Sequence, residues 1–358
     1  MSLLFEPLTL RSLTLRNRVW LAPMCQYSAV DGVPNDWHLV HLGARATGGF
    51  GLVFTEASAV TPEGRISPQD AGIWNDEQAA AWRRIVDFVH GQGAPIGVQL
   101  AHAGRKASTY RPWAPKHGTV PASEGGWTAV APSPVAFEGY AVPKPLALPE
   151  LAEVVTAFAD AARRAVATGF DTVEVHAAHG YLLHEFLSPL SNRRDDAYGG
   201  SFDNRVRLLL ETVDAVRAAI PDGMPLVVRI SGTDWVDGGW DVEQSTRLGR
   251  RLREHGVDLV DVSSGGNAPA SIPVGPGYQV PLSADVRRGA DVPTGAVGLI
   301  TEPAQAEKVL ANGEADVVLL ARAALREPAW PLRAAHELGV PADEAGWPDQ
   351  YKRGVWRA

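Results

Sequence analysis

The chain has 358 residues, of which 33 are Lys or Arg and 41 are Asp or Glu, and its formal net charge is -8. This balance leaves no basic block to grip a phosphate backbone, so we expect no nucleic-acid partner. The single cysteine, Cys25, excludes an internal disulfide and fits a reducing, cytoplasmic location. The start lacks a signal-peptide pattern and no run of about 18 apolar residues occurs, so we also expect no membrane partner.

Eight short runs of β-branched and aliphatic residues follow one another along the chain. Each run is continuous rather than alternating, which is typical of strands that are covered on both faces. The runs are "VWLAP" from 19, "GLVFTEA" from 51, "PIGVQL" from 95, "FDTVEV" from 170, "PLVVRI" from 225, "VDLVDV" from 257, "GAVGLI" from 295 and "ADVVLL" from 315. Segments of helical period separate them, among them 75–93, 148–169 and 203–220. The alternation predicts an α/β fold, a (β/α)8 TIM barrel, with residues 1–358 as one domain.

One connection is far longer than the others. Residues 107–148, after the third strand, form a stretch of 42 residues with seven prolines, four glycines and no sustained period. Because loops that follow barrel strands emerge at the rim where active sites lie, we predict that this insertion is a lid carrying Trp113 and Trp127. A flexible surface insertion without a role is the alternative.

The residues just after each strand should meet in one mouth of the barrel, and in this chain they are polar. They read "APMCQY", "TEAS", "VQLAHAGRK", "EVHAAHGY", "VRIS", "DVSSGG" and "LARAAL". The set predicts a ligand site at the mouth.

Two histidines and a tyrosine follow the fourth strand on one turn. His176 and His179 can turn their rings the same way, and two neutral imidazoles can donate two hydrogen bonds to one oxygen. Two alternatives stay open: a metal site completed by His184, or histidines that are satisfied independently. Tyr181 could deliver a proton to a substrate carbon, or it could be a packing residue.

Three further residues at strand ends point to a bound anionic or electron-rich group. Arg229 could hold negative charge that accumulates on a ring, or it could merely pair with Glu174. Gly298 and Arg322 follow strands seven and eight, where barrels of this type commonly bind phosphate. Since no dinucleotide fingerprint, P-loop or nucleophile elbow occurs, we predict a phosphorylated cofactor in the mouth, with the histidines facing it.

Five stretches together resemble the Old Yellow Enzyme family of FMN-dependent ene-reductases, nearly from end to end. They are "APMCQYS", "TEASAVTPEGRI", "GVQLAHAGRK", "EVHAAHGYLLHEFLSPLSNRRDDAYGGSFDNR" and "LLAR". The cysteine of the first stretch and the compact length resemble the thermophilic-like subclass, which includes the xenobiotic reductases. The resemblance implies bound FMN, with NADPH or NADH as the reductant and no metal.

The resemblance also implies roles for individual residues. The residues implied to line the FMN ring are Ala22, Pro23, Met24, Cys25, Ala57, Gln99 and Arg229. Those implied at the phosphate end are Gly298, Ala321 and Arg322, where Ala321 departs from the glycine that many relatives have. Those implied at the substrate are His176, His179, Tyr27 and Arg353. Tyr181 is implied as the proton donor, and Cys25 as the residue that tunes the flavin.

The implied reaction is NAD(P)H-dependent reduction of the activated C=C bond of an α,β-unsaturated carbonyl or nitro compound, by ping-pong hydride transfer. Arg353 lies in a tail, 340–358, that resembles one reaching a neighbouring subunit, so a homodimer or homotetramer is implied. One alternative function is a non-catalytic redox sensor in which Cys25 is oxidised. Another is a metal-dependent barrel hydrolase that uses His176, His179 and His184.

Overall fold

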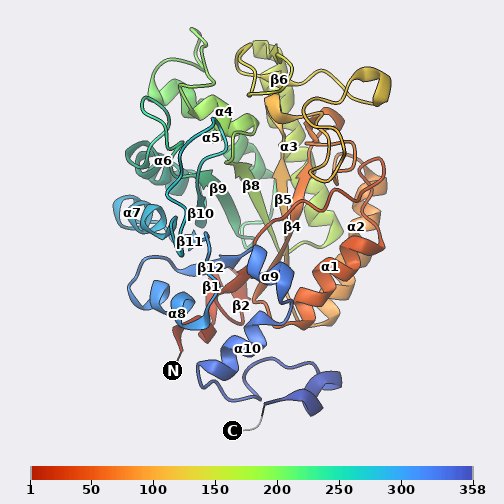
Figure 1. The fold of residues 1–358 in the computed structure, drawn as a ribbon, viewed down its shortest axis with the longest axis vertical. Helices are drawn as coiled ribbons and strands as arrows, with labels where there is room; N and C mark the ends of the chain where they lie inside the picture. Colours follow the sequence, from red (N-terminus) through yellow and green to blue (C-terminus); the bar gives the residue numbers. More distant parts are fainter. Residues whose placement is uncertain (1, 357–358) are drawn as a thin grey trace.

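The computed structural model describes residues 2–356, and among these residues eight parallel strands close into a barrel (Figure 1). The barrel strands are β3 (Val19–Leu21), β4 (Leu52–Ala59), β5 (Ile96–Ala101), β8 (Thr172–Ala177), β9 (Leu226–Ser231), β10 (Leu259–Ser263), β11 (Thr294–Ala296) and β12 (Val317–Leu320). Every residue of these strands is buried, as expected for strands covered on both faces. The predicted (β/α)8 barrel is therefore confirmed.

Helices surround the barrel. They are α1 (Asp36–Thr47), α2 (Asp76–Gly91), α3 (Leu148–Thr168), α4 (Leu182–Leu187), α5 (Phe202–Ala219), α6 (Val242–Glu254), α7 (Val280–Ala290), α8 (Pro303–Ala311), α9 (Arg322–Arg326) and α10 (Trp330–Glu337). Short 3-10 turns are η1 (Leu3–Phe5), η2 (Pro62–Gly64), η3 (Gly104–Lys106), η4 (Ala122–Glu124) and η5 (Asp349–Gly354). In the part of the chain described, none of the helices combines the length and apolarity needed to cross a bilayer.

The helix α3 illustrates why the periodic segments fold as expected. Its buried side chains recur every three or four residues, as at Leu151, Val154 and Phe158, so one stripe faces the barrel. The helix stops at Gly169, which takes the left-handed conformation with φ 99°, a backbone state that costs glycine little.

The seventh strand is shorter than expected. The run predicted from 295 ends as a strand at Ala296, and residues 297–300 form a loop instead. Positive φ angles at Gly298 (118°) and Leu299 (53°) turn the chain out of the strand. This loop lies at the mouth of the barrel, where it lines a cavity described below.

An N-terminal hairpin, which the sequence analysis did not anticipate, completes one end of the barrel. Its strands β1 (Leu8–Leu10) and β2 (Leu13–Leu15) pair antiparallel, and Leu10 and Leu15 are buried. They belong to the same apolar cluster as Trp20, Phe54 and Leu319 from the barrel strands. The barrel interior is therefore a packed core that is closed on this side, and a ligand can enter only from the opposite mouth.

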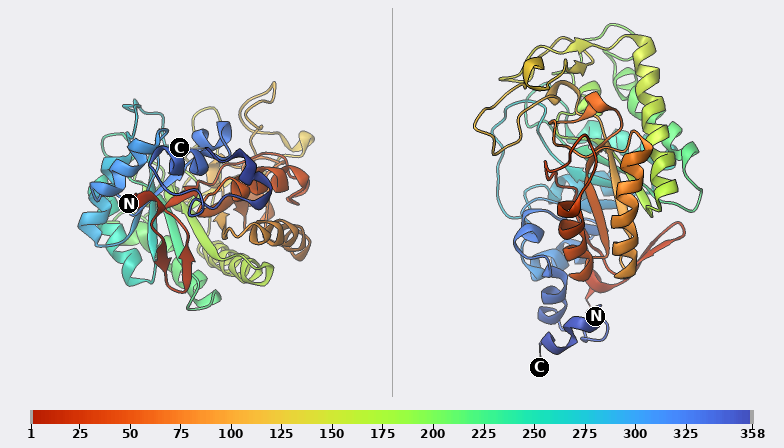
Figure 2. Two further views of the ribbon diagram at one scale, coloured as in Figure 1. Left: turned by 90° about the horizontal axis from the view of Figure 1, so that it is seen from below. Right: turned by 90° about the vertical axis from the view of Figure 1, so that its right-hand side faces the viewer.

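The segment between β5 and α3 and the C-terminal tail lie at opposite ends of the molecule (Figure 2). The segment 107–148 carries the short parallel strands β6 (Val130–Ala131) and β7 (Lys144–Pro145). It is tied to neighbouring loops, because Trp127 Nε1 donates a hydrogen bond to the Glu63 carbonyl at 2.8 Å. The ring of Trp113 in this segment contacts the ring of Tyr27 edge-on, with 5.6 Å between the ring centroids.

Candidate active site

The turn after β8 brings the three predicted catalytic side chains together. The rings of His176 and His179 are 5.2 Å apart between centroids and nearly perpendicular, at 88°. The ring of Tyr181 packs edge-on against His176, with centroids 5.1 Å apart. The two rings and the phenol therefore lie together, as a joint role of the histidine pair requires.

The turn that carries His179 is held in an uncommon backbone conformation. His179 has φ 59°, in the left-handed region that few side chains adopt without support. Its N–H donates to Ser231 Oγ at 2.9 Å, and its carbonyl accepts from Lys106 Nζ at 2.8 Å. Lys106 also donates to the Gly266 carbonyl at 3.0 Å, so two neighbouring loops clamp the turn. Ser231 and Lys106 are supporting residues that the sequence analysis missed.

The hydrogen bonds of the two rings indicate which nitrogens can face a ligand. The backbone N–H of Ala178 donates to His176 Nδ1 at 3.2 Å, so in the neutral ring Nε2 carries the proton and is a donor. His179 Nε2 lies 2.7 Å from Ser263 Oγ, which leaves Nδ1 for a ligand. Burial, with Arg229 as the next cause, lowers the pKa of both rings well below the usual value, so both are neutral at pH 7.

His184 does not complete a metal site with this pair. Its Nδ1 accepts a hydrogen bond from the Gly180 N–H at 2.8 Å, and its Nε2 faces Asp234 Oδ1 at 3.1 Å in the fully buried interior. Because one nitrogen accepts a backbone hydrogen bond and the other faces a carboxylate, the geometry argues against the metal alternative built on His184. Within residues 2–356, no three His, Cys, Asp or Glu side chains are grouped as metal ligands.

Arg229 lies inside the barrel and pairs with a residue that was not anticipated. Its Nε is 2.9 Å from Asp261 Oδ2, and both side chains are buried. The expected alternative partner, Glu174, instead accepts a hydrogen bond from Gln99 Nε2 at 2.6 Å. The strand register explains this difference, because Arg229 lies directly opposite Asp261 on β10 whereas Glu174 lies opposite Val227.

The loop after β3 brings Cys25 and Tyr27 to the same mouth. Both pack, together with Tyr181, on an apolar cluster that includes Ile66 and Ala103. Burial is the largest cause that raises the pKa of the Cys25 thiol well above its usual range, and the carboxylates of Asp70 and Glu56 add to it. The thiol is therefore protonated at neutral pH, and this makes it a poor nucleophile.

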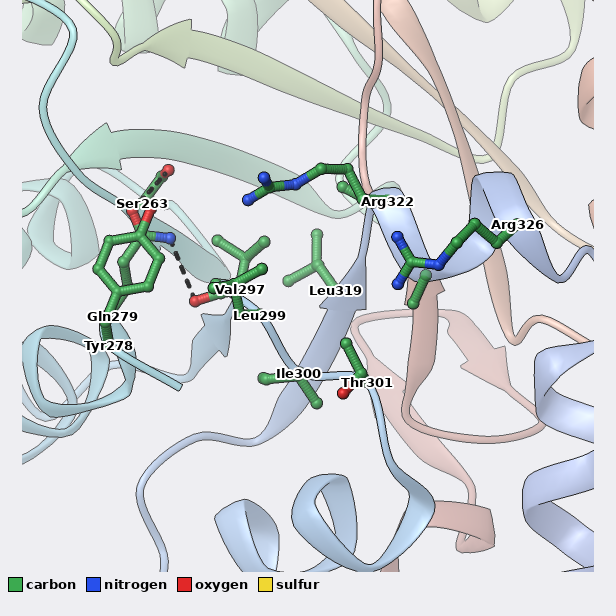
Figure 3. A pocket seen from close by; sticks show the side chains of 13 residues that line it. Ser263, Tyr278, Gln279, Val297, Leu299, Ile300, Thr301, Leu319, Arg322 and Arg326 are labelled. Atoms are coloured by element: carbon green, nitrogen blue, oxygen red, sulfur yellow. Dashed lines mark hydrogen bonds between the residues drawn. The ribbon is translucent and has the colours of Figure 1, made fainter. Parts of the chain in front are cut away.

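The ends of β11 and β12 form a cavity of about 170 Å³ (Figure 3). Its lining includes Gly298, Ala321 and Arg322, the three residues implied at the phosphate end, and also Arg326. Figure 3 shows the guanidinium groups of Arg322 and Arg326 extending from α9 on the same side. Arg326 was missed, although its spacing of four residues from Arg322 on a helix would have placed both on one face.

The backbone around this cavity fits a phosphorylated group that approaches closely. A Cβ on Gly298 would lie 2.8 Å from Gln279 Nε2, and φ 118° is strained for any other residue. Ala321 has φ -107°, outside the left-handed region that favours glycine. Two arginines beside a glycine cradle can supply charged hydrogen-bond donors to a phosphate group.

The other implied residues divide into two groups. Ala22, Pro23 and Met24 directly follow β3 at the same mouth, and Ala57 and Gln99 lie opposite each other within β4 and β5. Arg353 is exposed and lies on η5 in the tail, away from α4 and the histidine turn (Figure 1). Its contact with a neighbouring subunit stays a prediction.

A barrel with an arginine-lined cavity at the ends of β11 and β12, and a neutral imidazole pair at the same mouth, fits an FMN-binding oxidoreductase of the TIM-barrel class. Comparison with protein families leads to the same class, since residues 3–340 match the NADH:flavin oxidoreductase / NADH oxidase family. The chain belongs to this family.

Similar proteins cover the whole chain. It is 50% identical to an NADPH dehydrogenase of Geobacillus thermodenitrificans, covering 99% of each chain. It is 45% identical to an NADPH dehydrogenase of Bacillus subtilis, covering 98% of each. Morphinone reductase superposes with a TM-score of 0.80 at 29% identity, covering 97% of this chain and 96% of that one. A 2-naphthoyl-CoA reductase complex gives a TM-score of 0.85 at 25% identity, covering 94% of this chain and 52% of that one.

These matches confirm the resemblance to the Old Yellow Enzyme family. The protein is an NAD(P)H-dependent flavin oxidoreductase, with FMN and a nicotinamide as its cofactors. This assignment argues against both alternative functions, the non-catalytic sensor and the metal-dependent hydrolase.

Proposed function

We propose that the enzyme reduces the activated C=C bond of α,β-unsaturated carbonyl or nitro compounds. The observation that carries this proposal is the neutral imidazole pair, with ring centroids 5.2 Å apart, beside a buried phenol. An arrangement of two donors and one acid suits a substrate that gains negative charge on an oxygen and then a proton on a carbon.

In this proposal the histidines polarise the substrate. Bound FMN would supply the hydride-transfer chemistry, with NADPH or NADH as the reductant and the β-carbon of the alkene as the acceptor in a ping-pong cycle. His176 and His179 donate hydrogen bonds to the carbonyl or nitro oxygen, and these bonds strengthen as negative charge develops there. Because the benefit falls mainly on the transition state, the pair raises kcat.

Tyr181 supplies the proton in the proposed reaction. Burial raises the pKa of its hydroxyl well above the usual value, so the phenol keeps its proton in the resting enzyme. The electron pair left at the α-carbon then takes that proton from the phenol oxygen. Tyr27 lines the substrate pocket, and Trp113, whose ring contacts Tyr27, covers it as part of the lid 107–148.

The remaining implied roles are part of the same proposal. Around the flavin ring we propose Ala22, Pro23, Met24, Cys25, Ala57, Gln99 and Arg229. At its phosphate we propose Gly298, Ala321 and Arg322. The cytoplasmic location, the homo-oligomer and the entry of Arg353 into a neighbouring site stay predictions.

A substrate panel tests the proposed function. The FMN-loaded enzyme with NADPH or NADH should convert cyclohexenone to cyclohexanone and a nitroalkene to its nitroalkane, as followed by gas chromatography. Cyclohexanone itself is the control and should not be reduced, because its carbonyl is not conjugated to an alkene. Nicotinamide oxidation without any loss of C=C bonds would contradict the proposal.

The depressed histidine pKa values predict the pH dependence of alkene reduction. A histidine with the ordinary pKa of 6.5 would become charged as the pH falls through that value, whereas these two rings stay neutral. We therefore expect the rate constant for oxidation of the reduced enzyme by cyclohexenone to stay level from about pH 8 down to about pH 6. A fall centred near the ordinary histidine pKa would contradict this assignment of the pair.

Replacing Cys25 should change the redox potential of the flavin. The protonated thiol packs beside the proposed ring position, where it can donate a hydrogen bond that alanine cannot make. We expect Cys25→Ala to shift the midpoint potential, measured by dye-equilibrated reduction, with FMN content unchanged. An unshifted potential would mean that Cys25 is a packing residue only.

A further inference from the structure

Four buried polar side chains lie on four neighbouring strands inside the barrel: Gln99 on β5, Glu174 on β8, Arg229 on β9 and Asp261 on β10. Relative exposure is at most 5% for all four, and it is 0% for both carboxyl groups. We refer to them as the interior cluster. It contains two carboxyl groups and one guanidinium, so its net charge is -1 if every group is ionised.

The contacts within the interior cluster are unequal. Asp261 faces the Arg229 guanidinium at 2.9 Å, whereas Glu174 accepts a hydrogen bond only from the neutral amide of Gln99. The second oxygen of Glu174 and both oxygens of Asp261 are buried without a hydrogen-bond partner. Because buried charges need compensation, a proton on one of these carboxyl groups lowers the cost of burying both.

The charged neighbours identify the carboxyl group that holds this proton. Glu174 is faced by Arg229 from β9 and by Asp261 from β10, and His176 is two positions further along its own strand. Burial first, and then the charge of Asp261, raises the pKa of Glu174 to about 8. Burial also raises the pKa of Asp261, but Arg229 faces Asp261 at 2.9 Å, and this contact favours the ionised form of Asp261.

We propose that Glu174 is protonated at neutral pH. Asp261 alone then balances the charge of Arg229, and the interior cluster carries no net charge. This inference rests on the proposed placement of Arg229 beside the flavin ring. In a neutral cluster the charge of Arg229 is balanced by one carboxylate, so no net negative charge lies beside the ring. An ionised Glu174 would add a buried negative charge that opposes the addition of electrons to the ring.

Infrared spectroscopy of the FMN-loaded enzyme tests the protonation directly. At pH 7 the carbonyl band of a protonated carboxyl group should be lost in Glu174→Gln, which keeps the size of the side chain and its contact with Gln99. It should also be lost in Asp261→Asn, because Glu174 then becomes the only counterion of Arg229 and ionises. An unchanged band in these variants would overturn the proposal.

A matched variant distinguishes the effect of Glu174 in the interior cluster from the effect of a buried carboxyl group elsewhere. Glu185 on α4 is also fully buried with a pKa raised to about 8, but it accepts its hydrogen bond from the Arg105 backbone N–H, outside the barrel strands. Glu185→Gln should lose a similar infrared band and leave the dependence of the flavin potential on pH unchanged.

The flavin potential provides the second measurement. Above about pH 8 the potential of the wild-type enzyme should fall more steeply than that of Glu174→Gln, because only the wild type gains the negative charge. Parallel curves for the two proteins would overturn the proposal. Neither measurement uses an alkene, so failure of the proposed substrate class would leave both results interpretable.

Discussion

Replacing His176 with alanine is expected to slow the oxidation of the reduced enzyme by cyclohexenone by about 10²-fold to 10³-fold, the loss typical of one donor to a developing oxyanion. The geometry supports a direct role, because the Nδ1 of this ring is occupied by the Ala178 N–H and its Nε2 remains a donor. The same change at His179 should have a similar effect, and the double variant should be slower than either. Stopped-flow absorbance of the flavin measures each rate constant.

Two controls distinguish the loss of substrate polarisation from damage to the structure of the variant. The FMN content of each variant should match the wild type, because the histidines lie at the end of β8 and on the turn after it, whereas the phosphate cavity lies at the ends of β11 and β12. His90→Ala, a change at a partly exposed histidine on α2 that pairs with Asp171, should leave the rate unchanged. Alkene reduction at the wild-type rate in the double variant would disprove the role of the pair.

Removing the arginine at the phosphate cavity should have the second large effect. Arg322→Ala is expected to weaken FMN binding by about 10-fold to 100-fold, since a hydrogen bond to a charged group contributes about 1.5–3 kcal/mol. Arg322 lines the cavity together with Gly298, whose backbone permits close approach of the phosphate. Fluorescence quenching of the free flavin on titration with apoprotein gives the Kd.

Riboflavin is the matched control for this variant, because it lacks only the phosphate. Its Kd should be nearly the same for the wild type and Arg322→Ala. Equal weakening of riboflavin and FMN would indicate a damaged barrel mouth, and an unchanged Kd for FMN would show that Arg322 does not contact the phosphate.

The barrel could be predicted because its signals are local. Each buried strand is a continuous apolar run, and helices such as α3 show their period and their glycine stop within one stretch of sequence. The prediction failed where a few residues override the local pattern. Gly298 and Leu299 end β11 early through positive φ angles. The leucines of β1 and β2 close one end of the barrel only because they pack against residues that are distant in the sequence.

The candidate site was predicted in part for the same reason. His176, His179 and Tyr181 lie on one turn, so their proximity can be read from their spacing. The groups that support this turn come from far along the chain: Ser231 is 52 residues from His179, Lys106 is 73 and Ser263 is 84. A pairing across strands, such as that of Arg229 with Asp261, depends on the register of the barrel, which single-strand patterns do not determine.

An anaerobic titration of the purified yellow enzyme tests the central claim most directly. One equivalent of NADPH should bleach the absorbance of the bound flavin, and one equivalent of cyclohexenone should then restore it with the formation of cyclohexanone. A flavin that stays reduced in the presence of the enone, or a protein that does not take up FMN when it is supplied, would contradict the claim.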